Sequence, residues 1–414
     1  MSKLNEDRTM YLKMSGIFYF FFLSLSFSTS LLAIWLSQAL KLNGTATGLI
    51  FSINAVFGLF SQPIFGYISD KFGNRKNLLY FFAISLTLTA PFFIFVYEPL
   101  LKSNFIFGAI VGAIMLSSAF SMGPLESYIE KTGRKYHFEY GKARMWGSLG
   151  WASATFFAGA VYNINPDYNF WLASASGAIL LVIVVSTKIT VSDTEKEAAN
   201  SVTFHDILTL LKLKDFWAFA LFSLCIVCVY SVYDQQFPRF FANQFANLKI
   251  GNEMFGYLNS FQVFLEAGMM FVAPSIVNKI GPKKALLFAA FIMASRITLS
   301  GIVVGPVFIA IIKLMHSFEL PVLLIAVFKY LDLHFESRLS STLYLVGYQF
   351  FIQFGIIVFA PLVGKMYDTV GFRTTYLGLG IFVFVVFFAS IVSLRNDSVA
   401  KVMVPHYFKG ESDV

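Results

Sequence analysis

The sequence predicts an all-α membrane protein with twelve transmembrane helices in two pseudo-symmetric bundles of six. Hydrophobic residues fill 57% of the 414 positions and charged residues only 13%, a balance that the surface of a soluble globular protein does not tolerate. Apolar segments of about 20 residues, the length that crosses a bilayer, recur from Met14 to Leu394 with short breaks. These segments are continuously apolar rather than alternating, which favours helices over a transmembrane barrel.

The apolar segments define the predicted spans one by one. They cover residues 14–36, 46–68, 78–97, 105–130, 143–164, 169–187, 217–241, 254–277, 285–304, 306–332, 340–364 and 373–394. The breaks between them are too short to hold a sizeable soluble domain.

Basic residues are concentrated in alternate loops of this topology. They precede the first span and follow the second, fourth and eighth: Lys3, Arg8, Lys13, Lys71, Arg75, Lys76, Lys131, Arg134, Lys135, Lys142, Lys279, Lys283 and Lys284. Because Lys and Arg favour cytoplasmic loops, we expect both termini in the cytoplasm and a multi-pass protein of the inner (plasma) membrane. The net charge of +8 follows from this asymmetry, so it does not indicate a nucleic-acid partner.

The chain divides into two halves joined by a polar linker. We expect an N-terminal six-helix bundle at 1–187, a cytoplasmic linker at 188–216, a C-terminal six-helix bundle at 217–394 and a cytoplasmic tail at 395–414. A basic, glycine-bearing loop follows the second helix of each half, at Gly66–Lys76 and at Asn278–Lys284. Its presence at cognate places indicates an internal repeat.

Ionisable residues inside the predicted spans are the candidates for function. Each costs roughly 2.5 to 3.5 kcal/mol at a helix centre on insertion scales, so it is rarely placed there without a role. The carboxylates and cations are nearly balanced, which predicts mutual neutralisation inside the bundle. The set is Glu126, Arg144, Asp234, Glu266, Arg296, Lys313, His316 and Glu319.

Three of these residues share one stripe of the tenth span. Lys313, His316 and Glu319 are spaced by three residues, so they lie on one helix face. Burial favours a neutral carboxylic acid, whereas an approaching cation favours the carboxylate, and we therefore expect Glu319 to carry a proton. Arg296, which is never deprotonated, would drive its release. The alternative is a static network of buried ion pairs.

The loop after the second helix resembles the signature of the major facilitator superfamily. A more specific resemblance covers nearly the whole chain and is to the oligosaccharide:proton symporters, the lactose, raffinose and sucrose permeases. The matching stretches are Glu126–Lys131, Phe138–Trp151, Asp234–Phe237, Lys313–Pro321 and Arg338–Ser340. This resemblance implies the major facilitator fold and proton-coupled sugar transport.

The resemblance also implies residue roles. His316, Glu319 and Arg296 match the proton-coupling set, and Asp234 and Lys313 match a charge pair between spans 7 and 10 that could be purely structural. Glu126, Arg144 and Trp151 match positions that contact a sugar ring. The residue types fit, because Trp151 offers a flat apolar face and the charged pair offers fixed hydrogen bonds to hydroxyls. An ordinary lipid-buried aromatic is the alternative for Trp151.

The sequence departs from the lactose branch at positions that affect specificity. That branch has an Asp and Lys pair where this chain has Ser231 and Ile352, and its span-8 acid falls at Val263. An acid appears instead at Glu266, about one turn further along. The run Tyr257–Ala267 is similar to sucrose permeases.

We therefore expect sucrose, or a related glucosyl or fructosyl disaccharide, as the substrate. Gln262 and Glu266 would be additional ligands of its hydroxyl groups. The mechanism implied is alternating access, in which the halves rock about a central site. A symporter for lactose, melibiose or raffinose, a passive sugar facilitator, and a drug or ion antiporter remain alternatives. A membrane-embedded enzyme is disfavoured, because no nucleophile and base converge.

The expected partners are a disaccharide, a proton and the lipid bilayer, and we expect a monomer. No cofactor is predicted, and no ATP-binding motif is present. Cys225 and Cys228 have a C-x-x-C spacing, but they lie in an apolar run without further ligands, so no metal or redox site is predicted.

Overall fold

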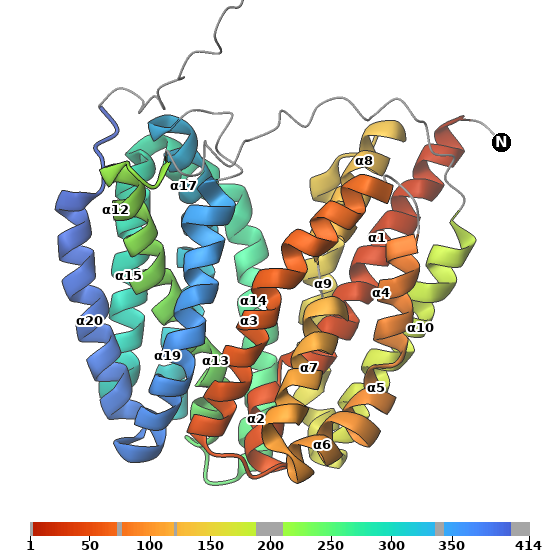
Figure 1. Ribbon diagram of the computed structural model, residues 1–414, viewed down its shortest axis with the longest axis horizontal. Coiled ribbons are helices and arrows are strands. Elements are labelled where there is room, and N and C mark those ends of the chain that lie inside the picture. The colour runs from red at the N-terminus through yellow and green to blue at the C-terminus, as the bar shows by residue number, and fades with distance from the viewer. Residues whose placement is uncertain (1–2, 73–76, 120–121, 188–209, 336–342, 399–414) are drawn as a thin grey trace, which may run out of the picture.

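The structure is a computed structural model that describes residues 3–72, 77–119, 122–187, 210–335 and 343–398. These residues form two groups of helices (Figure 1). The N-terminal half contains α1 (Lys3–Thr29), α2 (Leu32–Gln38), α3 (Gly44–Phe72), α4 (Asn77–Thr87), α5 (Thr89–Phe92), the π-helical η1 (Phe93–Tyr97), α6 (Glu98–Ser103), α7 (Phe105–Ala119), α8 (Met122–Lys135), α9 (Tyr140–Ile164) and α10 (Asp167–Ser186). The C-terminal half contains α12 (Lys214–Phe222), η3 (Ser223–Val227), α13 (Cys228–Ala242), α14 (Leu248–Ile280), α15 (Pro282–Ile302), α16 (Pro306–Leu314), α17 (His316–His334), η5 (Tyr344–Gln349), α19 (Phe350–Thr369) and α20 (Gly371–Ser393).

The helices account for the predicted membrane spans. Ten helical segments of the described chain are long and apolar enough to cross a membrane, and a pair bent by 54° at α4 and α5 would make eleven. We count α9 as the twelfth, because its 25 residues extend for about 37 Å and it packs along α1 and α14. It is less apolar than the others because it carries Lys142, Arg144 and many small residues.

The element boundaries differ from the sequence prediction where polar ends continue a helix. The predicted first span, 14–36, corresponds to two helices, α1 and α2, which a short turn separates, and α1 begins at Lys3. The predicted span 254–277 is the 33-residue α14. Backbone hydrogen bonds continue past the point at which hydropathy falls, so a hydropathy pattern shortens such helices.

Some predicted features lie outside the described residues. These are residues 73–76 of the first basic loop, most of the linker at 188–209, the matching stretch at Arg338 and the tail beyond 398. The predicted domain boundaries at 188 and 395 therefore stay predictions.

The two halves meet on one side of the molecule and diverge toward the other (Figure 1). We call the side that holds the start of α1, the end of α10 and the start of α12 the terminal side, and the opposite side the far side. α3 packs against α19, and α9 packs against α14. On the far side, the Ser52 hydroxyl donates to the Ile357 carbonyl at 2.7 Å, and the Asn163 amide donates to the Lys249 carbonyl at 2.7 Å. Gly159 allows this approach, because a Cβ there would overlap the backbone of Asn252.

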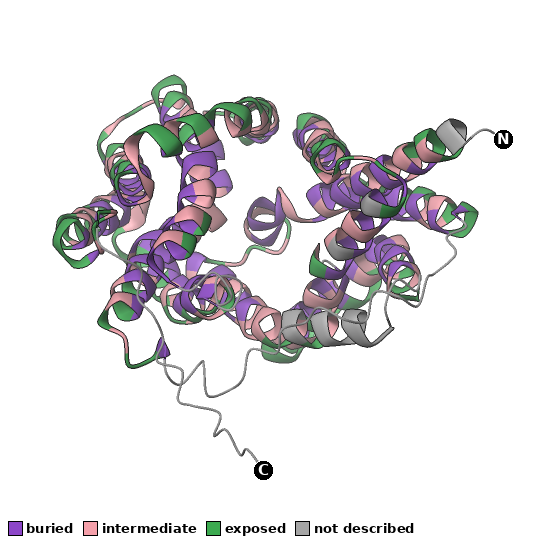
Figure 2. Ribbon diagram, turned by 90° about the horizontal axis from the view of Figure 1, so that it is seen from above, coloured by how far each residue is buried: buried purple, intermediate pink, exposed green. Residues whose placement is uncertain are grey.

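Apolar side chains cover the outer surface of the helices. Phe388 is 62% exposed and Val392 87%, which suits a surface surrounded by lipid. Figure 2 shows exposed residues mainly around the rim of the molecule and buried residues between the helices.

Candidate functional site

A buried ion pair lies at the centre of the C-terminal half. Arg296 of α15 donates from Nη2 to Glu319 Oε1 of α17 at 2.6 Å, and both side chains are fully buried. His316 Nδ1 lies 3.0 Å from the same carboxylate oxygen. The second oxygen, Glu319 Oε2, has no hydrogen-bond partner among the described residues. One carboxylate oxygen is thus shared by two basic groups, and the other has room for a proton.

A break in the tenth span places these side chains. The span is split at Met315 into α16 and α17, so Lys313 lies in the last turn of α16. His316 and Glu319 lie in the first turn of α17. The predicted single stripe is therefore carried by two helices that meet at the site.

A second ion pair lies beside the first and shares a charge with it. Lys313 Nζ of α16 donates to Asp234 Oδ1 of α13 at 2.6 Å, and Arg296 Nη1 lies 3.6 Å from the same oxygen. The Asp234 side chain is 28% exposed, whereas that of Lys313 is buried. The carboxylates of Asp234 and Glu319 balance the cations of Arg296 and Lys313 in formal charge.

Two tyrosines that sequence reasoning missed hold the arginine between their rings. The Arg296 guanidinium lies 4.9 Å from the ring centre of Tyr230 and 5.1 Å from that of Tyr233. The Tyr230 hydroxyl lies 2.9 Å from His316 Nε2, and the Tyr233 hydroxyl lies 2.8 Å from that of Ser300. Tyr230 lies one turn before Asp234, and Tyr233 lies one residue before it. Their position beside a charged residue in an apolar span was a sequence signal that could have identified them.

A third charge pair lies in the N-terminal half. Arg144 of α9 donates from Nε to Glu126 Oε1 of α8 at 3.1 Å. The side chains are 30% and 34% exposed, so both remain accessible for a ligand. The guanidinium also lies 4.3 Å from the ring centre of Phe22, and the pair interacts with Tyr140 at the start of α9. Trp151, half-buried, follows two turns later on α9.

The remaining predicted ligands lie on α14 in the other half. Gln262 is buried, and its carbonyl accepts from the Ser317 hydroxyl at 3.0 Å, beside the coupling histidine. Gln262 Oε1 has no hydrogen-bond partner within the described parts of the chain. Glu266, one turn along, interacts with Gln262 and electrostatically with His316 and Lys313. Glu266 therefore faces the charged cluster.

A cavity of about 270 Å³ lies between residues 145–152 of α9 and residues 263–271 of α14. The residues of its α9 wall are neighbours in sequence of Arg144 and Trp151, and the residues of its α14 wall are neighbours in sequence of Gln262 and Glu266. The cavity does not include these four residues in its lining, which is mostly apolar. The lining residues are Met145, Ser148, Leu149 and Ala152 on α9, and Val263, Phe264, Ala267, Gly268 and Phe271 on α14.

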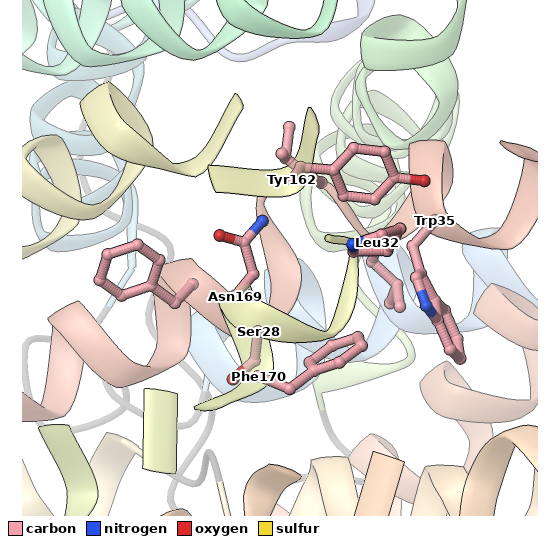
Figure 3. A pocket seen from close by; sticks show the side chains of 9 residues that line it. Ser28, Leu32, Trp35, Tyr162, Asn169 and Phe170 are labelled. Carbon is pink, nitrogen blue, oxygen red and sulfur yellow. The ribbon is translucent and has the colours of Figure 1, made fainter. Parts of the chain in front are cut away.

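A second cavity, inside the N-terminal half, is too small for a sugar. Its volume is about 10 Å³, at the lower limit for holding a single water molecule, and it lies among Trp35, Tyr162 and Phe170 (Figure 3). Asn169 points an amide into it, and Asn169 Oδ1 has no partner among the described residues. The described chain also contains no group of three His, Cys, Asp or Glu side chains that could hold a metal ion.

The comparisons with known proteins agree with this arrangement. A family described as the LacY proton/sugar symporter matches residues 3–406. The chain is 39% identical to the sucrose permease of Escherichia coli over 399 residues, covering 94% of this chain and 96% of the relative. It is 39% identical to the lactose permease of Klebsiella oxytoca, covering 90% and 91% of the two chains.

Solved structures with the same fold are more distant in sequence. The nucleoside transporter NupG aligns with a TM-score of 0.78 at 15% identity, covering 93% of this chain and 98% of that one. A D-xylose-proton symporter aligns with a TM-score of 0.67 at 12% identity, covering 96% and 99%. These likenesses support the predicted major facilitator fold. The whole-chain family match and the 39% identity show that this chain is a multi-pass inner-membrane transporter, not an enzyme, and that it belongs to the LacY family of proton/sugar symporters.

Proposed function

We propose that the sugar carried with the proton is sucrose, taken into the cell by alternating access. The observation that supports coupled transport of a proton and a sugar is the pairing of two unlike sites. A neutral, buried charge cluster lies in the C-terminal half, and an accessible Glu126 and Arg144 pair lies across the inter-half cavity in the N-terminal half. The first suits a proton, and the second suits the hydroxyl groups of a sugar.

Glu319 is the proposed proton carrier, with His316 and Arg296 as its partners. In this structure Arg296 binds Glu319 at 2.6 Å, as expected for the ionised carboxylate. Protonation of Oε2 would remove the charge that holds Arg296, which could then rely on Asp234, 3.6 Å away. The arginine thus has an alternative carboxylate within the same cluster, so loading and unloading of Glu319 need only a small displacement.

Glu126, Arg144 and Trp151 are the proposed sugar ligands on one side of the cavity, and Gln262 and Glu266 on the other. Arg144 can present a planar fork to two hydroxyls while Glu126 accepts from a third. Because Glu266 also interacts with His316, a bound sugar would touch both the binding site and the charge cluster. Asp234 and Lys313 are proposed as a structural pair.

The choice of sucrose rests on α14 and on two neutral positions. Relatives named for sucrose, lactose and melibiose are each 39% identical, so overall identity does not separate these sugars. Val263 lines the cavity where the lactose branch has an acid, and Glu266 supplies a carboxylate one turn away. Ser231 and Ile352 stand where the lactose branch has an Asp and Lys pair. The Ser231 hydroxyl donates to the Val227 carbonyl of the same helix, and Ile352 is buried, so the loss of both charges leaves no unpaired charge.

We also propose that the termini and the linker are cytoplasmic and that the protein acts as a monomer. With that orientation the far side faces the periplasm. The halves contact each other there and diverge toward the terminal side, so this conformation would release sugar into the cytoplasm.

The test is a pH recording from lightly buffered, de-energised cells that express the protein. Sucrose, lactose, melibiose, raffinose and maltose are added in turn. Alkalinisation with sucrose but not lactose is the expected result. Alkalinisation with lactose would keep symport and overturn the specificity argument. No response to any sugar would favour a passive facilitator or another substrate class.

A further inference from the structure

We propose that Asp368, at the end of α19, is a helix cap shared between the halves that latches the far side closed. Asp368 belongs to the C-terminal half, and the helix that it caps, α3, belongs to the N-terminal half. The contact is separate from the proton cluster and from the proposed sugar ligands, so it stands or falls independently of the proposed function.

The carboxylate of Asp368 accepts three hydrogen bonds from two consecutive residues of α3. Gly44 N donates to Oδ1 at 2.7 Å, Thr45 N donates to Oδ2 at 2.7 Å, and the Thr45 hydroxyl donates to Oδ2 at 2.7 Å. Hydrogen bonds to a charged acceptor are among the stronger ones in proteins. The site is filled on both carboxylate oxygens.

Asp368 is part of the N-terminal cap of α3, because it binds backbone N–H groups that no residue of α3 binds. The first backbone N–H groups of a helix have no partner within the helix. Asn43, the residue before α3, accepts from Ala46 N at 2.8 Å with its side chain, but it leaves Gly44 N and Thr45 N to Asp368. The positive end of the helix dipole adds to the attraction for a carboxylate. When the halves separate on this side, α3 loses two of its caps together.

The neighbouring contacts show why this latch can be both firm and reversible. Gln236 of α13 donates to the Gly44 carbonyl at 3.0 Å, which fixes the same turn of α3 from the C-terminal half. Asp368 itself is exposed, so water can replace its bonds once the halves part.

The second contact line across the far side has different chemistry. Asn252 of α14 exchanges amide hydrogen bonds with Gln38 at 3.0 and 3.1 Å and donates to Asn163 at 3.2 Å. On the same line, Asn163 donates to the Lys249 carbonyl at 2.7 Å and to the Glu253 carboxylate at 3.0 Å, so this contact also includes one charged acceptor. The α3 and α19 contact differs in that a single carboxylate accepts all three hydrogen bonds from the other half.

The experiment measures the distance across the far side with spin labels. Cysteines at Ser103, at the end of α6, and at Val304, between α15 and α16, place one label on each half; both residues are exposed. Cys225 and Cys228 are replaced in the background. The distance distribution is recorded for the parent, Asp368→Ala and Asp368→Asn in the absence of sugar.

The expected result is a rise in the population with a long far-side distance, on the order of tenfold for Asp368→Ala in the open-to-closed ratio. Asp368→Asn should lie between this variant and the parent, because its amide can accept only one of the two backbone donors. Asn43→Ala is the matched control: it removes a cap from the same helix end without touching the other half, and it should leave the distribution unchanged.

Thr45→Val keeps the inference testable if the Asp368 variants fold poorly. It removes only the hydroxyl donor and conserves volume, and a smaller shift in the same direction is expected. An unchanged distribution in Asp368→Ala and Thr45→Val would overturn the latch. A shift of equal size in Asn43→Ala would also overturn it, because the effect would then come from the end of α3 itself.

Discussion

Replacement of Glu319 by glutamine is expected to abolish uphill accumulation of sugar and to leave sugar exchange intact. Gln keeps an acceptor oxygen for Arg296 and a similar volume, but it cannot take up or release a proton at working pH. Glu319→Ala should have the same effect on transport, but it should also destabilise the protein more. It would leave the buried Arg296 with only Asp234 at 3.6 Å, and breaking a buried pair costs about 3–5 kcal/mol.

The size of the loss follows from the driving force. One charge moving through 100 mV is worth about 2.3 kcal/mol, which corresponds to roughly 50-fold accumulation if one proton accompanies each sugar. Without a proton on residue 319, the sugar carries no charge across, and the ratio should fall to about one. Exchange moves no net charge, so the membrane potential does not act on it.

The assay uses membrane vesicles and radiolabelled sucrose. Accumulation is followed under an imposed potential, and exchange is followed from preloaded vesicles without one. Glu98→Gln is the matched control, since that carboxylate pairs with Lys102 at 2.5 Å within one half and far from the cluster. Accumulation at the level of the parent in Glu319→Gln would refute the assigned role.

Three further substitutions test the surrounding residues. Lys313→Ala and Asp234→Ala should each lower the free energy of unfolding in detergent by about 3 kcal/mol or less, because Asp234 is 28% exposed. The double variant should recover most of the loss, and additive losses would contradict a pair. Arg144→Lys should weaken sucrose binding about tenfold, since a lysine cannot present the planar fork, and unchanged binding would remove Arg144 from the sugar site. Glu266→Gln should weaken sucrose binding about tenfold, with Val263→Ala as a control that stays within about twofold; equal effects of the two would argue against a direct hydrogen bond from the sugar to Glu266.

The helices could be predicted from the sequence because lipid imposes a simple length and hydropathy rule on each span. The charged cluster was also foreseeable, since Asp234, Arg296, Lys313 and Glu319 are conspicuous in apolar segments. Their actual partners depend on the break at Met315 and on helix rotation, neither of which hydropathy encodes.

Other features depend on tertiary contacts that leave no local pattern. Asp368 looks like an ordinary polar residue at the end of a span, and only the approach of α3 from the other half gives it partners. Tyr230 and Tyr233 are two among 19 tyrosines, and their contact with Arg296 follows from the packing of α13 on α15. The cavity wall at Val263 and Phe264 likewise depends on how far α9 and α14 separate.

The most direct test of the central claim is an infrared difference spectrum of the purified protein, recorded on addition of sucrose at fixed pH. If Glu319 carries the proton, the spectrum should contain a carboxylic acid band that is absent in Glu319→Gln and retained when Asp234 and Lys313 are both replaced by alanine. Persistence of that band in Glu319→Gln would contradict the assignment of the proton to Glu319.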